Sequence, residues 1–522
     1  MKDSADGRGT PPTLSRNDGG LTWAGSNQIP PPTGVAGVGG PNDITQDYGM
    51  DGNLYGTYLT SVPPGGACGA TNFDVYSASN TTPITGGLFS YFTVAGIAQL
   101  TDFGGSQGCA DQPWLLTNAD PTTSTQTNTY VGYDDDSGNN MRVSVALGTQ
   151  PPDFTKDNVA GVTFGGGVNQ GFRLAVDPRT GAVYSLYQTC LSGCGGSPKT
   201  IGYKLNRSLD AGTTWTLNGS GTGVQVASGS TIQPTPKFGT VNALLGGIDH
   251  AAVDPTTSNV YVVYGDDNGS GGNAVFIKQI TFDNSSPTMA IPGAAHQVSL
   301  PGAQAALPSV AVAANGTVGV LYTSFDGFDV NGFPIYSGHF AYSTDAGAAF
   351  TDKTLLTFLS PAKDNGNSRQ RVLGDYQQLK VVNDLPLANA GATFYGVFTG
   401  NGAALGDPVS SNQAIFFKVT LAPQINLNPN PLSIGNVCEG STGSAQLEVS
   451  DTGADNLLIS SITRSWGSTD ISLATGPTFP VNISPDANFN FTLLAPRLRS
   501  APRARPSTSR ATIRSVRVLR SR

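Results

Sequence analysis

The sequence predicts an all-β fold, and two features of its composition and one repeat lead to this prediction. The 522 residues include 67 Gly and 35 Pro, whereas charged residues make up only 12%. Of the 36 acidic residues, only Glu439 and Glu448 are glutamate. Aspartate is a turn residue and glutamate a helix former, so this bias excludes coiled coils and long surface helices and indicates many Asp-capped turns.

The repeat is a hairpin in which a short apolar strand, a turn rich in Asp, Pro, Asn or Gly, and an aromatic, β-branched strand follow one another. Its copies span residues 44–58, 114–133, 172–187, 250–264, 309–322 and 377–398. Their starts are 59 to 76 residues apart, which leaves room in each unit for two more strands, such as 141–147, 274–281 and 414–421. A four-stranded unit repeated six times is typical of a β-propeller. A β-sandwich is the alternative, but it does not require the same hairpin six times.

A second repeat is the octapeptide Ser208-Leu-Asp-Ala-Gly-Thr-Thr-Trp215, which fits the pattern Ser-x-Asp-x-Gly-x-Thr-Trp. Residues 343–350 are a degraded copy, and residues 16–23 are a third copy with Arg in the Ser place. This motif resembles the Asp-box of the bacterial neuraminidase repeat, and the resemblance to sialidase-like propellers covers about residues 1–421. The resemblance implies a structural role, in which the box joins the third and fourth strands of a blade away from the active site. The residues expected in this role are Asp18, Trp23, Ser208, Asp210, Gly212, Trp215, Asp345 and Phe350.

Changes in composition divide the chain. Residues 1–27 are expected to supply a ring-closing strand or a part-blade, which would be a seventh blade. Residues 28–422 are expected to form the propeller. Residues 423–496 resemble the immunoglobulin-like modules of the ASH or choice-of-anchor D type and are expected to form an incomplete β-sandwich. Residues 497–522 contain nine Arg and no acid. They are either a basic arm for anionic membrane or nucleic acid, or a disordered tail from a shifted reading frame; we favour the second interpretation.

The cysteines and the charge indicate the compartment and the partners. Cys190 pairs with Cys194 in our prediction, Cys68 pairs with Cys109, and Cys438 has no evident partner. Disulfides and a low Lys content are typical of secreted or cell-surface proteins, although the chain starts without an apolar signal segment, so we expect a trimmed N-terminus. No apolar run reaches the ~18 residues that span a bilayer. Without the Arg-rich tail, 19 basic residues face 36 acidic ones, a net −17 that argues against nucleic acid. We expect a monomer.

Propeller ligands bind where the first strands of the blades converge, so the hairpin starts predict the site. The ligand-binding residues expected there are Asp43, Asp111, Arg173, His250, Arg371 and Tyr376, with Asp249 and Asp375 as a candidate catalytic pair. The rim carries Asp134–Asp136, Asp266–Asn268, Asp326 and Asp329. Converging carboxylates suit acid–base chemistry or calcium. The rim lacks EF-hand spacing, so we expect no metal or other cofactor and keep calcium as the alternative.

The sialidase resemblance implies a clamp of three Arg, a Tyr nucleophile polarised by a Glu, and an Asp acid–base. Residues 1–438 contain no Glu, and the internal Arg residues 142, 173, 179, 207, 369 and 371 match no family motif. We therefore expect a secreted, sialidase-like propeller that binds a glycan or a cell-surface protein and lacks sialidase chemistry. A glycoside hydrolase using an Asp pair and a structural adhesion module remain the alternatives, so whether the chain is an enzyme stays open.

Overall fold

The structure is a computed structural model, and it describes the following residues: 12–15, 24–28, 42–62, 72–81, 109–135, 138–148, 152–162, 172–194, 199–231, 249–270, 272–283, 289–365, 372–374, 376–382, 392–423, 425–451, 453, 457–462, 471–474, 478–484 and 487–496. The chain divides into two compact units. Unit 1 comprises Met1–Val381 and Phe394–Lys418, and unit 2 comprises Val382–Thr393 and Val419–Arg522. None of the described residues forms a helix that is both long and apolar enough to cross a membrane.

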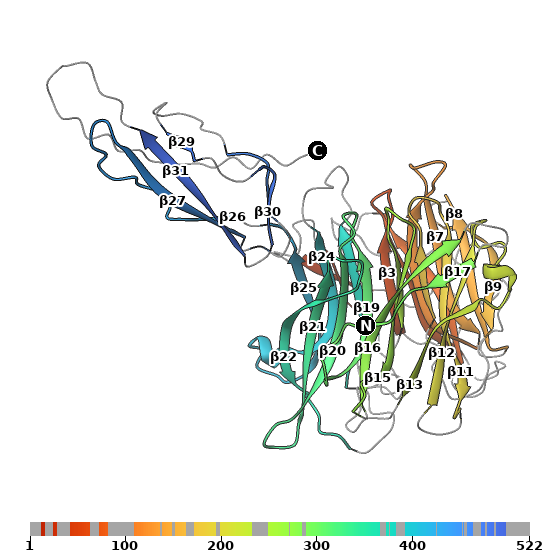
Figure 1. Ribbon diagram of the computed structural model, residues 1–522. Helices are drawn as coiled ribbons and strands as arrows, with labels where there is room; N and C mark the ends of the chain where they lie inside the picture. The colour runs from red at the N-terminus through yellow and green to blue at the C-terminus, as the bar shows by residue number, and fades with distance from the viewer. Residues whose placement is uncertain are drawn as a thin grey trace. The chain divides into compact units, whose positions relative to one another are not determined.

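Unit 1 consists of antiparallel sheets whose strands follow one another in chain order (Figure 1). We number them along the chain from sheet 1 to sheet 6. Sheets 1 and 2 contain the strands β3 (Asn42–Tyr48), β4 (Leu54–Val62) and β5 (Asn72–Asn80), and β6 (Ala110–Ala119), β7 (Thr127–Asp135), β8 (Asn140–Leu147) and β9 (Phe154–Val162), respectively. Sheets 3 and 4 contain β10 (Arg173–Val176), β11 (Val183–Ser192), β12 (Lys199–Ser208) and β13 (Val224–Thr231), and β14 (His250–Val253), β15 (Val260–Asp267), β16 (Asn273–Asp283), β17 (Met289–Pro292) and β18 (His296–Gln297), respectively. Sheets 5 and 6 contain β19 (Gln304–Val312), β20 (Val318–Phe328), β21 (Pro334–Ser343) and β22 (Thr351–Leu359), and β23 (Gln378–Val382), β24 (Thr393–Asn401) and β25 (Asn412–Thr420), respectively.

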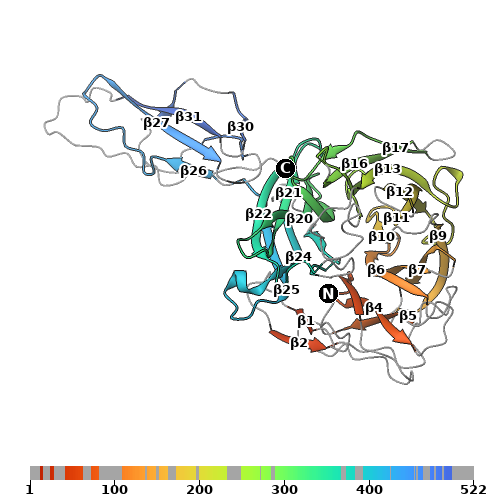
Figure 2. The ribbon, with the colours of Figure 1, turned by 90° about the horizontal axis from the view of Figure 1, so that it is seen from below.

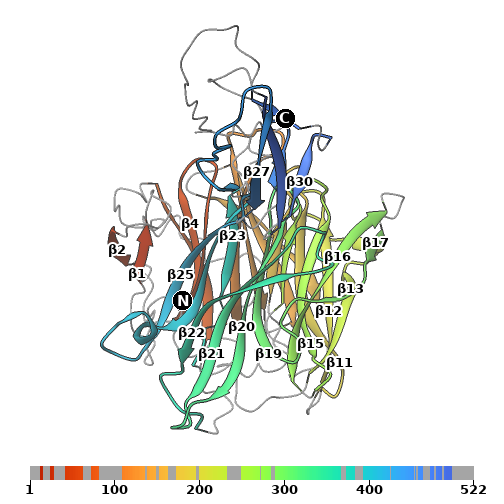
Figure 3. The ribbon, with the colours of Figure 1, turned by 60° about the vertical axis from the view of Figure 1, so that its left-hand side comes forward.

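The first two strands of every sheet coincide with one of the six hairpins expected from the sequence. Figure 3 shows β19, β20, β21 and β22 side by side in this order. Two short 3₁₀ helices, η3 (Leu217–Gly219) and η4 (Gly402–Leu405), lie in connections. The described residues are therefore all-β apart from these two turns, as the composition predicts.

The sheets surround a common axis, which is the arrangement of a β-propeller (Figure 2). The first strand of each sheet lies innermost, and β3 contacts β6, β6 contacts β10, β10 contacts β14, and β14 contacts β19. The backbone N–H of Leu379 on β23 donates to Ser309 Oγ on β19 at 3.0 Å. Lys380 Nζ on β23 lies 3.1 Å from Asp47 Oδ1 on β3, so this ion pair links the last sheet back to the first.

Each innermost strand is an edge strand, so half of its N–H groups have no strand partner within the sheet. Side chains of the preceding sheet accept several of them. Thr45 Oγ1 accepts from Leu115 N at 2.8 Å, His250 Nδ1 from Val310 N at 3.3 Å, and Ser309 Oγ from Leu379 N at 3.0 Å. These three acceptors lie at equivalent positions of β3, β14 and β19. The inner edges are therefore satisfied by the ring itself.

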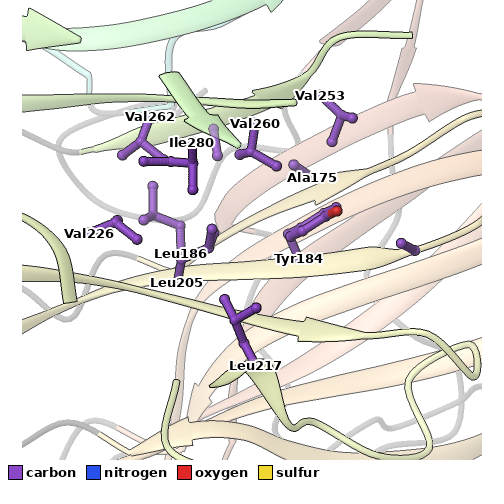
Figure 4. Close-up of a cluster of buried hydrophobic side chains, with 12 residues drawn as sticks. Ala175, Tyr184, Leu186, Leu205, Leu217, Val226, Val253, Val260, Val262 and Ile280 are labelled. Carbon is purple, nitrogen blue, oxygen red and sulfur yellow. The ribbon is translucent and has the colours of Figure 1, made fainter. Parts of the chain in front are cut away.

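The hydrophobic core lies between successive sheets (Figure 4). Leu186 and Leu205 of sheet 3 pack against Val260, Val262 and Ile280 of sheet 4, and all five are fully buried. The alternate residues of β15 face the other way, into the core shared with sheet 5. Both faces of β15 are thus covered, which explains its continuous apolar run, because a half-exposed strand would alternate apolar and polar residues. Complete burial of one such side chain contributes ~1.5–3 kcal/mol.

Two copies of the octapeptide repeat lie in the described residues, and each joins the third and fourth strands of its sheet. In residues 208–215, Ser208 Oγ accepts the N–H of Gly212 at 2.8 Å and donates to Asp210 Oδ1, which also accepts the N–H of Thr214 at 2.8 Å. Gly212 has φ +79°, which favours glycine. Residues 343–350 repeat these bonds with Ser343, Asp345 and Gly347.

The side chains that end the two octapeptides differ in exposure. Trp215 is buried in the core that sheets 2 and 3 share, and Phe350 is half-buried. The third copy, with Asp18 and Trp23, lies outside the described residues.

Disulfides occur at the predicted loops. Cys190 and Cys194 are joined at the end of β11, with their Cα atoms 5.7 Å apart. Cys109 is disulfide-bonded at the start of β6, and its predicted partner Cys68 lies outside the described residues. Cys438 is a free, exposed thiol.

The N-terminal strands form a separate hairpin. The strands β1 (Pro12–Ser15) and β2 (Ala24–Gln28) pair with each other as a two-stranded sheet. The turn between them contains the predicted octapeptide 16–23, which the structure does not describe. Whether this hairpin serves as a ring-closing strand or a part-blade stays a prediction.

Unit 2 is also all-β in its described residues. One sheet has the order β26 (Ile425–Asn428), β27 (Thr442–Asp451), β31 (Asn488–Pro496) and β29 (Ser472–Leu473), and a second sheet pairs β28 (Leu457–Ile459) with β30 (Val481–Ile483). Val449 of the first sheet and Ile459 and Ile483 of the second share one core. The Arg-rich residues 497–522 lie outside the described part of the chain.

A substitution at Thr45 tests the satisfaction of the inner edge. Thr45→Val keeps the shape of the side chain and removes its hydroxyl, which leaves the N–H of Leu115 buried without an acceptor. We expect the free energy of unfolding to fall by ~1–3 kcal/mol, as measured by urea unfolding followed by tryptophan fluorescence. Thr45→Ser, which retains the hydroxyl, is the matched control and is expected to lose clearly less. Equal stability of the Val and Ser variants would contradict the role of this bond.

Candidate functional site

Four side chains from four sheets meet where the inner strands begin. Trp114 lies on β6, Arg173 opens β10, His250 opens β14, and Tyr376 precedes β23. The Trp114 ring centroid lies 5.2 Å from that of His250, with the rings edge to face, and 6.4 Å from that of Tyr376, with the rings stacked. The Arg173 guanidinium carbon lies 4.4 Å from the Trp114 centroid and 5.5 Å from the Tyr376 centroid. We call these four residues the axial cluster.

Arg173 brings a positive charge into the interior of unit 1. Its side chain is 1% exposed, and Nη1 donates to the Phe172 carbonyl at 2.8 Å and to Gln112 Oε1 at 3.4 Å. The faces of Trp114 and Tyr376 offer the guanidinium favourable cation–π contacts, worth ~2 kcal/mol or more where water is excluded. Arg173 is therefore held in one position by rings from sheet 2 and from the segment before β23.

His250 is neutral and its tautomer is fixed by the fold. Nδ1 accepts the N–H of Val310, so the ring proton resides on Nε2. Burial lowers the pKa of His250 well below its usual value, and the charges of Arg173 and then Lys380 lower it further. Nε2 is buried and has no hydrogen-bond partner among the described residues. His250 therefore brings an N–H donor without a partner among the described residues into the axial cluster.

Asp249 directly precedes His250, the residue with which β14 begins. It is fully buried, and Oδ1 accepts from Gln188 Nε2 on β11 at 2.9 Å, whereas Oδ2 has no partner in the described part of the chain. Burial raises the pKa of Asp249 to about 6, against the opposing effects of Gln188 and the charge of Arg173. A carboxyl with this pKa holds a proton in mildly acidic solution and is suited to general acid chemistry.

Two of the remaining mouth residues of the prediction lie at bulges of inner strands. Asp43 has φ 46° at a bulge of β3, and Asp111 accepts the N–H of Gln112 at a second bulge on β6. Arg371 and Asp375 lie outside the described residues. The predicted catalytic pair of Asp249 and Asp375 is thus untested. Of the predicted set, Arg173, His250 and Tyr376 meet around Trp114.

Two carboxylates of the predicted rim accept backbone N–H groups. Asp266 Oδ1 accepts the N–H groups of Ser230 and Asp267, and Asp329 Oδ1 accepts those of Asn331 and Phe333. Among the residues that the structure describes, no three His, Cys, Asp or Glu side chains are grouped closely enough to hold a metal ion. The prediction about calcium remains untested, because Asp136 and other loop residues are not described.

Sequence reasoning missed Trp114 as a site residue and also missed a Ser–His–Asp chain in sheet 5. His339 Nδ1 lies 2.9 Å from Asp352 Oδ1, and Nε2 lies 2.9 Å from Ser324 Oγ. These distances match a catalytic triad, but Ser324 is 2% exposed and donates its only hydroxyl proton to Asp326 at 2.6 Å. These three hydrogen-bonded side chains therefore connect β20, β21 and β22 and do not activate a nucleophile. They are too far apart in the sequence to form a recognisable motif.

No protein-family model and no curated protein sequence matches the chain. Similar solved structures include an ulvan lyase of polysaccharide lyase family PL25, with 12% identity over 76% of this chain and 84% of that chain and a TM-score of 0.37. A fungal lectin from Aleuria aurantia has 13% identity over 71% of this chain and 93% of that chain, with a TM-score of 0.33. An α-L-arabinofuranosidase from Fusarium graminearum has 11% identity over 74% of this chain and 93% of that chain, with a TM-score of 0.35. Because these scores are low, the propeller assignment rests on the sheets themselves.

The pKa of Asp249 predicts how its replacement changes stability with pH. The folded pKa of about 6 exceeds the usual aspartate value of 3.8, so the folded state binds the proton more tightly than the unfolded state. The contribution of this group to stability is therefore present below pH 3.8 and is lost as the pH rises through about 6.

Asp249→Asn keeps the acceptor for Gln188 and removes the charge. We expect the variant to be more stable than the native protein at pH 8 by ~1–3 kcal/mol, and the difference to shrink at pH 4, as measured by urea unfolding at both values. A variant that is less stable than the native protein at pH 8 would show that the ionised Oδ2 has a favourable partner.

Proposed function

We propose that this chain is a glycan-binding β-propeller of six blades, with its ligand site at the axial cluster and without sialidase chemistry. In this proposal, the octapeptide turns are Asp-boxes, and unit 2 is an immunoglobulin-like module of a protein that is exported from the cell. Sheets 1 to 6, in chain order around one axis, support the blade count.

The observation that carries the proposal is the meeting of Trp114, Arg173, His250 and Tyr376, because each comes from a different part of the ring. The axial cluster combines two aromatic rings, a guanidinium and an imidazole N–H without a partner among the described residues, which are group types that suit apolar contact and hydrogen bonding with a saccharide. Small-molecule sites are usually of this kind, with aromatic walls and a few placed polar groups. A buried imidazole N–H without an acceptor among the described residues is unusual and is consistent with a site for a ligand.

The positions of the described arginines argue against sialidase chemistry. Arg142 Nε is bound to Asp157 at 3.2 Å within sheet 2, Arg179 donates to the Thr256 carbonyl and to Ser258, and Arg207 lies over the ring of Phe282. Among the described residues, Arg173 alone enters the axial cluster, and its guanidinium is covered by two rings. A carboxylate clamp needs several guanidinium groups that converge on one point.

A second candidate function is glycoside hydrolysis, which the environment of Asp249 favours. A carboxyl with a pKa of about 6 and an unpartnered Oδ2 fits the general acid of such a reaction. The candidate requires a second carboxylate, for which Asp375 is the sequence-based choice.

A saccharide array probed with the full chain tests glycan binding. We expect at least one class of saccharide to bind, and Tyr376→Leu to weaken the binding at least tenfold, because the substitution removes a face of the axial cluster. Tyr395→Leu is the matched control, since Tyr395 is a half-buried tyrosine of sheet 6 that contacts Phe416. Saccharide binding that both variants retain would move the site away from the axis. An array without any bound saccharide would favour a protein partner or a structural adhesion role.

A panel of fluorogenic glycosides tests the second candidate. If the chain is a hydrolase, we expect turnover that falls at least 100-fold in Asp249→Asn and a rate that declines above pH 6, where Asp249 loses its proton. Sialosides are expected to remain intact in either case. Turnover that Asp249→Asn leaves unchanged would exclude Asp249 as the acid.

A further inference from the structure

The inner strands place one side chain per sheet at an equivalent position around the axis. Thr45 accepts the N–H of residue 115, His250 that of residue 310, and Ser309 that of residue 379. In each pair, the donor directly follows the residue of the next sheet that is equivalent to the acceptor. Applying the same rule to every inner strand gives one equivalent residue per sheet, and we call this set the axial layer. Its members are Thr45, Trp114, Arg173, His250, Ser309 and Gln378.

Three members of the axial layer carry nitrogen atoms that lack a partner. Trp114 Nε1, His250 Nε2 and Gln378 Nε2 are each buried and without a hydrogen bond among the described residues. They belong to sheets 2, 4 and 6. All three are donors, because indole and amide nitrogens carry protons and the His250 proton is on Nε2. An unpaired buried donor costs ~1–3 kcal/mol, so three in one layer indicate a ligand with acceptor atoms.

The charge around the layer has the matching sign. The charges that lower the pKa of His250 are those of Arg173 and Lys380, both positive. Arg173 lies 4.4 Å from the Trp114 ring centroid. Lys380 Nζ is partly neutralised by Asp47 Oδ1, and the other oxygen of Asp47 accepts the N–H of Thr117 at 3.0 Å. In a chain with a formal net charge of −8, two cations thus act on His250, and the buried carboxyl of Asp249 lies within the influence of one of them, Arg173.

We propose that the axial layer is a binding site for an oxyanion, namely a carboxylate or sulfate group held by the N–H groups of Trp114, His250 and Gln378. Such a group presents only acceptor oxygens, whereas a neutral hydroxyl would bring a proton that these donors cannot accept. The anion is either free in solution or the acid group of a saccharide. That the anion belongs to a saccharide rests on the proposed glycan binding, whereas the existence of the anion site does not.

Calorimetric titration of the full chain with sodium sulfate, sodium glucuronate and glucose tests the site. We expect sulfate and glucuronate to bind one to one, and glucose, the neutral counterpart of glucuronate, to bind at least tenfold more weakly. Binding of sulfate alone supports the site and assigns it to the free anion. Heats equal to dilution for both anions would overturn the proposal, since the layer then holds only water.

Two conservative variants assign the binding to these donors. Trp114→Phe keeps a ring against Arg173 and removes the indole N–H, and His250→Asn keeps an acceptor for the N–H of Val310 and removes Nε2. Each is expected to weaken anion binding at least tenfold. Trp215→Phe is the matched control, because Trp215 Nε1 is also buried and unpartnered but lies in the turn after β12. Circular dichroism and urea midpoints verify that every variant is folded.

The outcomes separate this inference from the proposed function. Saccharide binding on the array, together with sulfate and glucuronate heats that equal dilution, would overturn the anion site while glycan binding stands. Sulfate binding that both variants abolish, together with an array that shows no bound saccharide, would support the anion site and reject glycan binding. An equal loss in Trp215→Phe would mean that the effect is not specific to the axial layer, and would overturn the assignment.

Discussion

The hydrogen bonds from the inner edge of one sheet to side chains of the sheet before it are the interaction on which unit 1 depends. Every sheet ends at the axis with an unpaired strand edge, and an unpaired edge is costly when buried. Thr45, His250 and Ser309 each accept one such N–H. Asp47 does the same for Thr117 and also joins sheet 1 to Lys380 of sheet 6. The backbone N–H groups of the inner strands therefore depend on the closed ring for their hydrogen-bond acceptors.

The same bonds determine the chemistry of the axis. Because His250 uses Nδ1 to accept a neighbouring N–H, its only proton must lie on Nε2, next to Trp114. The residues that hold the sheets together thus also decide which atoms remain for a ligand. Arg173 adds a charge that its aromatic neighbours hold in place. Scaffold and candidate site are one set of residues, so a substitution in the site is best made isosteric.

Much of the fold was predictable, because hairpins and turns are local. Asp177 in residues 172–187 and Asp254 in residues 250–264 accept the N–H groups two residues on, as the Asp-Pro turns predicted. The structure brings together Arg173, His250 and Tyr376, which the hairpin starts placed near the axis, and their role in binding a ligand stays a prediction. Trp114 was missed because the bulge between Asp111 and Trp114 leaves no sequence signal. Asp249 was grouped with His250 as its neighbour in sequence, and the structure pairs its carboxyl with Gln188 of β11.

The measurement that tests the account most directly is the protonation pattern of the His250 ring, read by ¹⁵N–¹H correlation NMR at pH 7 and assigned with His250→Asn. The account predicts a proton on Nε2 and a bare Nδ1 that accepts the N–H of Val310. A proton on Nδ1 would contradict it, because the inner edge of β19 would then lose its acceptor and the axis would lose the donor on which the anion site depends.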